Sequence, residues 1–157
     1  MNDLRANDRS LRAETDGESV GRLLLLASRS YSDRAITLMR ERGHPGLAMT
    51  HAMILPHVDS AGTRLTALGD RAGITKQAAG QTVRDLERLG YVIRAPDPSD
   101  GRASLISLTR RGQIFLVDAI AIRTQIAAEF AAALGEEPLG LLRDILAALL
   151  AARPFAE

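Results

Sequence analysis

The apolar residues of the first part of the chain recur three and four positions apart. From Glu18 to about Arg42 this spacing predicts a long amphipathic helix. Its apolar positions are Val20, Leu23, Leu24, Ala27, Tyr31, Ala35 and Leu38. The stretch from Gly43 to Gly46 contains a proline and ends this helix. A second helix is predicted from about Ala48 to Val58, with Leu47, Ile54, Leu55 and Val58 facing inward.

A short helix and a longer one follow, separated by a glycine. The first is predicted from Leu65 to Ala72, because Gly73 suits the left-handed position that follows a helix. The hydroxyl of Thr75 can cap the second helix. This helix extends to Leu89. Its buried stripe is Ala79, Val83, Leu86 and Leu89, and its opposite side carries Lys76, Gln77, Gly80, Gln81, Arg84 and Arg88.

After Gly90 the pattern changes from helical spacing to alternation. A strand is predicted from Tyr91 to Ala95, then a charged turn, then a second strand from Ser104 to Leu108. A helix followed by a β-hairpin and another helix is the order of a winged helix-turn-helix. This unit places one helix in the major groove of DNA and a hairpin beside it.

The last part of the chain predicts two more helices. Thr109 caps the first, of about 24 residues, with Ile114, Val117, Ala121, Ile126 and Phe130 on one side. Glu136 and Glu137 lie at the positive end of the last helix, whose apolar face is Leu139, Leu142, Ile145, Leu146 and Leu149. Together with the Leu23–Ala27 run, these faces are too apolar for a lone small domain. They predict a C2 homodimer that pairs through both chain ends.

Charge and composition narrow the class of protein. The net charge is only +1, but residues 61–112 carry nine basic and five acidic side chains, so the middle of the chain is basic. This distribution fits a DNA-reading module held by a neutral scaffold. The absence of cysteine excludes disulfides and thiolate metal sites. With no long apolar run and a polar N-terminus, we expect a cytoplasmic protein that does not span a membrane.

Four motifs stand out between residues 73 and 112: the Gly73-Ile74 joint, the Leu-Glu-x-x-Gly end at Gly90, the wing Asp-Pro-x-Asp-x-Arg ending at Arg102, and the Leu-Thr-x-x-Gly motif ending at Gly112. This set of motifs resembles the MarR family of bacterial transcription regulators. It implies a triangular homodimer that binds a pseudo-palindromic operator in double-stranded DNA and usually represses. It also implies a small aromatic or phenolic effector, bound between the dimerisation helices and the winged helix.

The predicted organisation is therefore mainly α-helical with a small β-hairpin wing. Residues 1–17 form a polar tail, frayed or weakly helical, and residues 18–152 form a single MarR-like domain. Within it, the winged helix covers about residues 61–112, and the dimerisation helices cover about residues 18–42 and 110–152.

The candidate DNA-binding residues are Thr75, Lys76, Gln77, Gln81, Arg84, Asp100 and Arg102. Gln77, Gln81 and Arg84 share one helical face. Glutamine suits adenine and arginine suits guanine, so we expect the glutamines at base edges and Lys76 and Arg84 at phosphate or guanine. Arg102 is expected in the minor groove, held by Asp100 through a charge-assisted hydrogen bond. The alternative is that these are solvated polar residues and a structural ion pair in the hairpin.

Other chemistry is less strongly indicated. Tyr31, Met53 and His57 are candidate ligand-binding residues, with core packing as the alternative for the first two. The three histidines are spaced seven and six apart without a completing carboxylate cluster, so no metal or cofactor is predicted. No catalytic constellation is present, and we expect no enzyme.

A dimeric small-molecule- or partner-binding protein with weak or no specific DNA binding stays open as an alternative function, because Gly101 and Gln81 stand where the resembled family often has basic residues.

Overall fold

The computed structural model describes residues 19–152, without the side chains at positions 101 and 102. The predicted tail, residues 1–17, lies outside this range. The helices are α2 (Val20–Glu41), α3 (Met49–Ile54), the 3-10 turn η1 (Leu55–His57), α4 (Leu65–Ala72), α5 (Lys76–Arg88), α6 (Arg110–Leu134) and α7 (Glu136–Ala152). The strands are β1 (Thr63–Arg64), β2 (Val92–Asp97) and β3 (Asp100–Leu108). The predicted class, mainly helical with a β wing, is confirmed.

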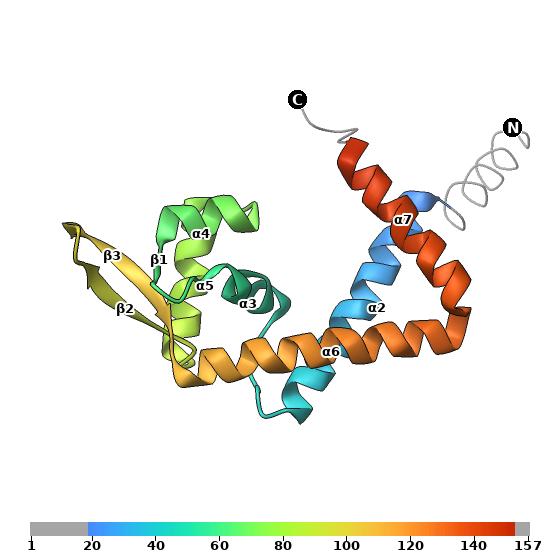
Figure 1. The fold of residues 1–157 in the computed structure, drawn as a ribbon, viewed down its shortest axis with the longest axis horizontal. Coiled ribbons are helices and arrows are strands. Elements are labelled where there is room, and N and C mark those ends of the chain that lie inside the picture. The colour runs from blue at the N-terminus through green and yellow to red at the C-terminus, as the bar shows by residue number, and fades with distance from the viewer. Residues whose placement is uncertain (1–18, 153–157) are drawn as a thin grey trace, which may run out of the picture.

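Helix α6 runs along the molecule and joins its two ends (Figure 1). The β2–β3 hairpin lies at one end with α4 and α5, and α7 and the start of α2 lie at the other. Helix α2 begins at Val20, two residues after the predicted start, because the Ser19 hydroxyl caps it by accepting a hydrogen bond of 3.2 Å from the Arg22 amide. It packs against α6, and Arg34 on α2 forms an ion pair of 2.5 Å with Glu129 on α6.

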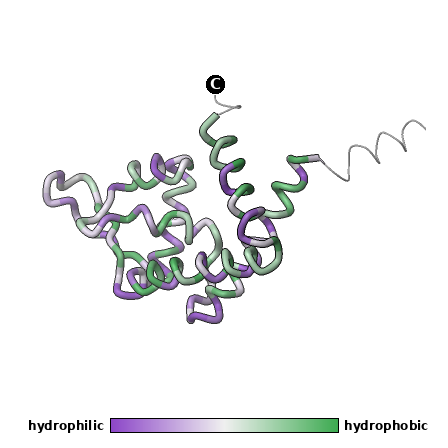
Figure 2. Tube along the Cα trace, turned by 45° about the vertical axis from the view of Figure 1, so that its right-hand side comes forward, coloured by the Kyte–Doolittle hydropathy of each residue, from purple (hydrophilic) through white to green (hydrophobic). Residues whose placement is uncertain are grey.

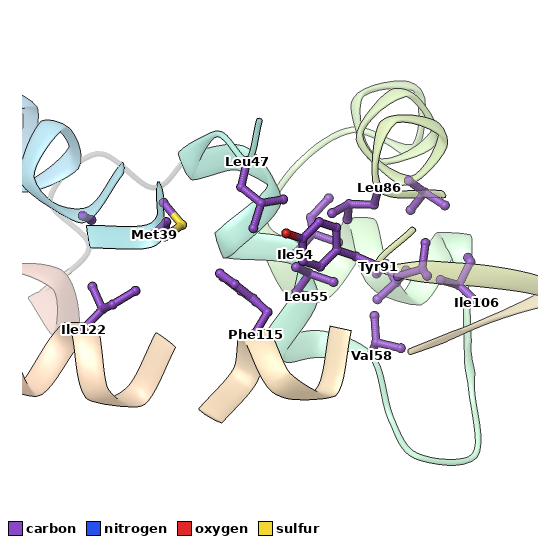
Figure 3. Packing of buried hydrophobic residues seen from close by; sticks show 14 of the residues in the cluster. Met39, Leu47, Ile54, Leu55, Val58, Leu86, Tyr91, Ile106, Phe115 and Ile122 are labelled. Carbon is purple, nitrogen blue, oxygen red and sulfur yellow. The ribbon is translucent and has the colours of Figure 1, made fainter. Parts of the chain in front are cut away.

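The hydrophobic core lies where the helices meet the base of the wing. Leu47, Ile54, Leu55 and Val58 are buried as predicted, in and around α3 and η1. They pack in one cluster with side chains from the other elements, among them Met39, Leu86, Tyr91, Ile106, Phe115 and Ile122 (Figure 3). Burial of these side chains from several elements fixes the winged helix on the scaffold helices.

The helix-turn-helix follows the predicted pattern closely. Gly73 adopts φ +65°, the left-handed conformation expected after α4, and the Thr75 hydroxyl caps α5 by accepting a hydrogen bond from the Ala78 amide. Ala79, Val83 and Leu86 are fully buried. Gly80 is also buried, so the prediction that it lies on the outer side is wrong. A Cβ at Gly80 would lie 3.7 Å from Leu65 on α4, where the two helices approach closely.

The wing is a three-stranded antiparallel sheet in the order β1–β3–β2. The hairpin was predicted, but β1 was not. This strand contains only two residues, and Thr63 pairs with Ile106 while Arg64 pairs with Leu105. Alternation of polar and apolar residues cannot be recognised over so short a segment. By pairing with β3, β1 ties the start of α4 to the wing.

The apolar side chains predicted on one side of α6 are mostly exposed. Ile114 and Val117 are 49% and 69% exposed and Phe130 is 38% exposed, whereas Phe115, Ile122 and Ile126 are buried. Of the predicted positions only Ile126 is buried, and Ala121 is partly buried. Helix α6 has apolar residues on more than one side, so its periodicity does not select the face that packs against α2 and the core.

The far end of the molecule leaves apolar side chains uncovered. Glu136 and Glu137 occupy the first turn of α7 as predicted, and no residue of α7 is buried. Leu142, Ile145 and Leu149 on α7 are 43%, 55% and 39% exposed, and Leu25 and Leu26 on α2 are 74% and 51% exposed. Figure 2 shows hydrophobic stretches along both helices at this end. Within residues 19–152, no helix is both long and apolar enough to cross a bilayer.

Candidate nucleic-acid interface and effector pocket

The outer face of α5 carries the predicted DNA-facing side chains. Thr75, Lys76 and Gln77 are exposed at its start, and Gln81 and Arg84 are exposed one turn later. The buried stripe on the opposite side anchors the helix to the core. The structure therefore brings these five predicted residues together on one accessible helical face.

Hydrogen bonds between neighbouring side chains orient part of this face. Arg84 Nη2 donates to Gln81 Oε1 at 2.7 Å, and Gln81 Nε2 donates to Asp85 Oδ2 at 3.3 Å. Hydrogen bonds from Gln81 and Arg88 hold the pKa of Asp85 below its usual value. To read a base with both amide atoms, Gln81 would have to exchange these exposed bonds for bonds to DNA. Such an exchange costs little for groups that water already reaches.

Asp97 organises the tip of the wing, which the sequence analysis did not predict. Its buried carboxylate accepts hydrogen bonds from the Ser99 amide at 2.8 Å and the Ser99 hydroxyl at 2.6 Å. It also accepts two from the Arg64 guanidinium, at 2.8 Å from Nε and 2.5 Å from Nη2. The Asp-Pro-Ser sequence, typical of a turn, was the available signal. Asp97 thereby connects the wing tip to the start of α4.

Of the predicted wing pair, Asp100 and Arg102, the structure describes the side chain of Asp100 only. Asp100 begins β3, and its carboxylate lies 3.9 Å from the Arg64 guanidinium. The backbone of Arg102 lies in β3, but its side chain lies outside the described part of the structure. Its contact with Asp100 and its position in the minor groove therefore stay predictions.

A buried polar junction connects the wing to the scaffold helices. His44, 3% exposed, lies in the loop after α2, and its Nδ1 is 3.0 Å from the hydroxyl of Tyr91. Its Nε2 is 2.9 Å from Asp118 Oδ2 on α6. Both ring nitrogens of this buried histidine are thus satisfied. We call His44, Tyr91 and Asp118 the Tyr91 junction. Sequence reasoning missed it because the three residues are far apart in the chain.

The backbone of Tyr91 carries a second set of contacts. Its carbonyl oxygen accepts hydrogen bonds from the amide and the hydroxyl of Thr109, at 3.0 and 3.1 Å, where α6 begins. A Cβ at Gly112 would collide with this oxygen. The guanidinium of Arg111 lies 4.6 Å from the centre of the Tyr91 ring. Burial raises the pKa of the Tyr91 hydroxyl, opposed by Arg111. The Leu-Thr-x-x-Gly motif thus fastens α6 to the base of the wing.

The three predicted ligand-binding residues surround one pocket, which we call the effector pocket. It has a volume of about 440 Å³ and lies between α2, α3, η1 and α6. Its walls are mainly apolar and include Met39, Met49, Met53, Ala119 and Ile122, with the polar groups of Tyr31, Ser32, His57 and Arg123. Tyr31 also packs on the core. Met53 is 57% exposed, so the alternative of core packing is wrong for Met53.

Phe115 belongs both to the effector pocket and to the surroundings of the Tyr91 junction. It lines the pocket from α6. Its ring packs edge-on against His44 and Tyr91, with centroids 5.3 and 6.1 Å away. The buried ring of Phe115 therefore lies between the pocket and the side chain of Tyr91 at the base of the wing.

The Asp97 carboxyl predicts an acid-dependent stability. Hydrogen bonds from Ser99 and then Arg64 lower its pKa from 3.8 to about 2. Because the folded state lowers this pKa, Asp97 stabilises the protein above the unfolded value, and that contribution is lost as pH falls toward 2. Asp97→Asn should lower the urea midpoint most near neutral pH, and its difference from wild type should shrink on acidification. A constant difference from about pH 6 to pH 3 would contradict this assignment.

Comparison with known proteins gives a consistent result. Residues 46–103 match the model of the MarR family. No curated protein sequence matches the chain significantly.

Several solved structures have a similar fold. A MarR transcriptional regulator of Methanosarcina mazei has a TM-score of 0.69 and 17% identity, covering 85% of this chain and 94% of its own. A MarR family protein of Mycobacterium tuberculosis in complex with salicylic acid has a TM-score of 0.62 and 25% identity, covering 85% and 98%. CouR of Rhodococcus jostii, bound to p-coumaroyl-CoA, has a TM-score of 0.65 and 23% identity, covering 89% and 96%.

The segment that matches the family model contains α4, α5 and most of the wing, which are the elements that carry the candidate interface. The solved regulators share the arrangement of these elements on their scaffold helices. Over residues 46–103 the chain therefore matches the MarR family model, and its fold is similar to those of solved MarR transcriptional regulators.

Proposed function

We propose that this protein is a ligand-responsive transcriptional repressor that binds a pseudo-palindromic operator as a homodimer in the cytoplasm. The observation that carries the proposal is the exposed polar face of α5, which lies beside a hairpin wing and opposite a fully buried stripe. A helix anchored on one side and polar on the other can enter the major groove without disturbing the core.

Each residue of the interface has a proposed role. Gln77 and Gln81 contact base edges, for which their amides offer a donor and an acceptor. Lys76 and Arg84 engage phosphate or guanine, and Thr75 orients the helix start. Arg102 enters the minor groove from β3, with Asp100 beside it. Base contacts give sequence preference, whereas phosphate contacts give register and affinity.

Binding to DNA from beside the protein's own gene tests this proposal. Fluorescence anisotropy with labelled duplexes covering that intergenic DNA should show saturable binding, weakened by salt. Gln77→Ala should lower affinity for the preferred duplex by about 1–3 kcal/mol and leave non-specific binding nearly unchanged. Arg40→Ala, on an exposed position of α2, should behave as wild type. No binding to any such duplex would favour the alternative, a small-molecule- or partner-binding protein of this fold.

The homodimer is supported by the uncovered apolar faces of α2 and α7. Exposed leucines and isoleucines belong to α7 and to the start of α2. These two segments lie at the end of the molecule opposite the wing (Figure 1). A second copy that packs there would remove them from water and would relate the two recognition helices by a twofold axis. Helices about 34 Å apart then meet successive major grooves on one side of the duplex.

A charged residue in this face should prevent dimerisation. Wild type should elute with a light-scattering mass of twice the 16.9 kDa of one chain. Ile145→Arg would place an unpaired charge in the apolar face and should yield a monomer with much weaker operator binding. Arg143→Ala serves as the control, because it also changes the charge of α7 by one but places no charge in the apolar face; it should stay dimeric. A wild-type protein that stays monomeric at micromolar concentration would contradict the dimer.

A small aromatic or phenolic effector is proposed for the effector pocket. Its volume, about 440 Å³, lies in the range of small-molecule sites, and a few polar groups interrupt mainly apolar walls. Arg123 could pair with a carboxylate on such a ligand. The contact of Phe115 with His44 and Tyr91 offers a route from the pocket to the wing. A ligand can release the protein from DNA only if it binds the DNA-free arrangement of the protein more tightly than the DNA-bound arrangement.

Salicylate and phenol are suitable probes of this pocket. Ligand that binds only the folded protein raises its stability by about 2.7 kcal/mol at a hundredfold excess over Kd. We expect a salicylate-dependent rise in Tm that His57→Ala and Arg123→Ala reduce and Arg40→Ala does not. The same salicylate concentration should weaken DNA binding. An unchanged Tm with both probes would contradict an aromatic effector of this kind.

A further inference from the structure

A second hollow lies between the wing and the start of the recognition helix. Its volume is about 380 Å³, and three cationic side chains line it: Arg64 before α4, Lys76 at the start of α5, and Arg94 on β2. The hydroxyl-bearing residues Thr66 and Ser104 also line it. We call it the basic hollow. It lies beside the base-reading face of α5 and is separate from the effector pocket.

Carboxylates orient two of these cations without using all their donors. Arg64 uses Nε and Nη2 for Asp97, and Arg94 uses Nε for Glu87 at 3.2 Å. Among the described residues, no hydrogen bond involves Arg64 Nη1 or either Nη of Arg94. A guanidinium held from one side by a carboxylate keeps a fixed orientation and presents its remaining N–H groups to a second acceptor.

The geometry of a DNA duplex determines what can reach this place. With α5 in the major groove and the wing in the neighbouring minor groove, one sugar–phosphate strand separates the two elements. That strand must pass between the start of α5 and the wing, where the basic hollow lies. The nearby carboxylates partly neutralise the hollow, which makes it a poor site for a free anion. It suits a phosphate that the bound duplex brings into place.

We propose that the basic hollow holds a DNA backbone phosphate, with Arg94, Arg64 and Lys76 as its cationic contacts. The inference rests on the proposed DNA-binding function and adds Arg64, Arg94, Thr66 and Ser104 to the interface. Because Arg64 also binds Asp97 at the wing tip, the phosphate contact fixes the wing relative to α5. The site contributes affinity and register and does not distinguish base sequences.

The salt dependence of DNA binding tests this site directly. The probe is a fluorescein-labelled duplex of mixed sequence, for which binding reports phosphate contacts. Each phosphate contact contributes about 0.9 to the slope of log K against log salt. Arg94→Ala should reduce the slope by about one for each subunit bound, whereas Arg94→Lys, which keeps the charge, should retain it. Arg40→Ala removes the same charge away from the hollow and should leave the slope unchanged.

The outcomes separate this inference from the proposed function. If Arg94→Ala keeps the wild-type slope, the phosphate site is wrong. This holds even if the variant binds more weakly by the same factor at every salt concentration, because a merely structural role of Arg94 would have that effect. Lys76→Ala provides a second variant, with a similar loss of slope expected. Thermal unfolding verifies that each variant is folded. A wild-type protein that binds neither this duplex nor the intergenic DNA would overturn the DNA-binding function itself.

Discussion

The orientation of the wing depends on the Tyr91 junction. Tyr91 is fully buried at the base of β2, where its hydroxyl meets His44 and its carbonyl oxygen meets Thr109. His44 in turn contacts Asp118 on α6. Buried polar groups are costly when one partner is removed, so this network strongly favours one arrangement of the loop after α2, the wing and α6. The scaffold consequently holds the wing and α5 as one unit.

The same unit has two further attachments near its surface. Asp97 and Arg64 join the wing tip to the start of α4, and β1 pairs with β3 to hold the same region. The wing is thus fixed at its base by buried groups and at its tip by a charged pair. This double attachment keeps the basic hollow open between the wing and α5. Phe115 packs edge-on against His44 and Tyr91 at the base of the wing.

The local structure was predictable from the sequence because its signals are local. Gly73, Thr75 and Thr109 determine helix ends through backbone conformation and capping bonds, and all three lie where expected. The hairpin followed from alternation and the Asp-Pro-Ser turn. The candidate α5 face could be predicted as well, because a buried stripe defines its opposite side.

Contacts between distant segments were not predictable in the same way. The inner face of α6 depends on which neighbours cover it, and its apolar residues surround much of the helix. The partnership of His44 with Asp118, 74 positions apart, leaves no pattern in the sequence. The two-residue strand β1 exists only because β3 lies beside it. These features arise from tertiary packing, which periodicity alone does not determine.

In the proposed complex, α5 and the wing straddle one DNA strand in each of two symmetric half-sites. Hydroxyl-radical footprinting of the protein on the intergenic DNA beside its gene tests this most directly. We expect two protected half-sites whose centres lie about 10–10.5 base pairs, one helical turn, or a multiple of this apart. Each should have a protected minor-groove segment beside it. A single unsymmetrical footprint, or no protection at saturating protein, would contradict it.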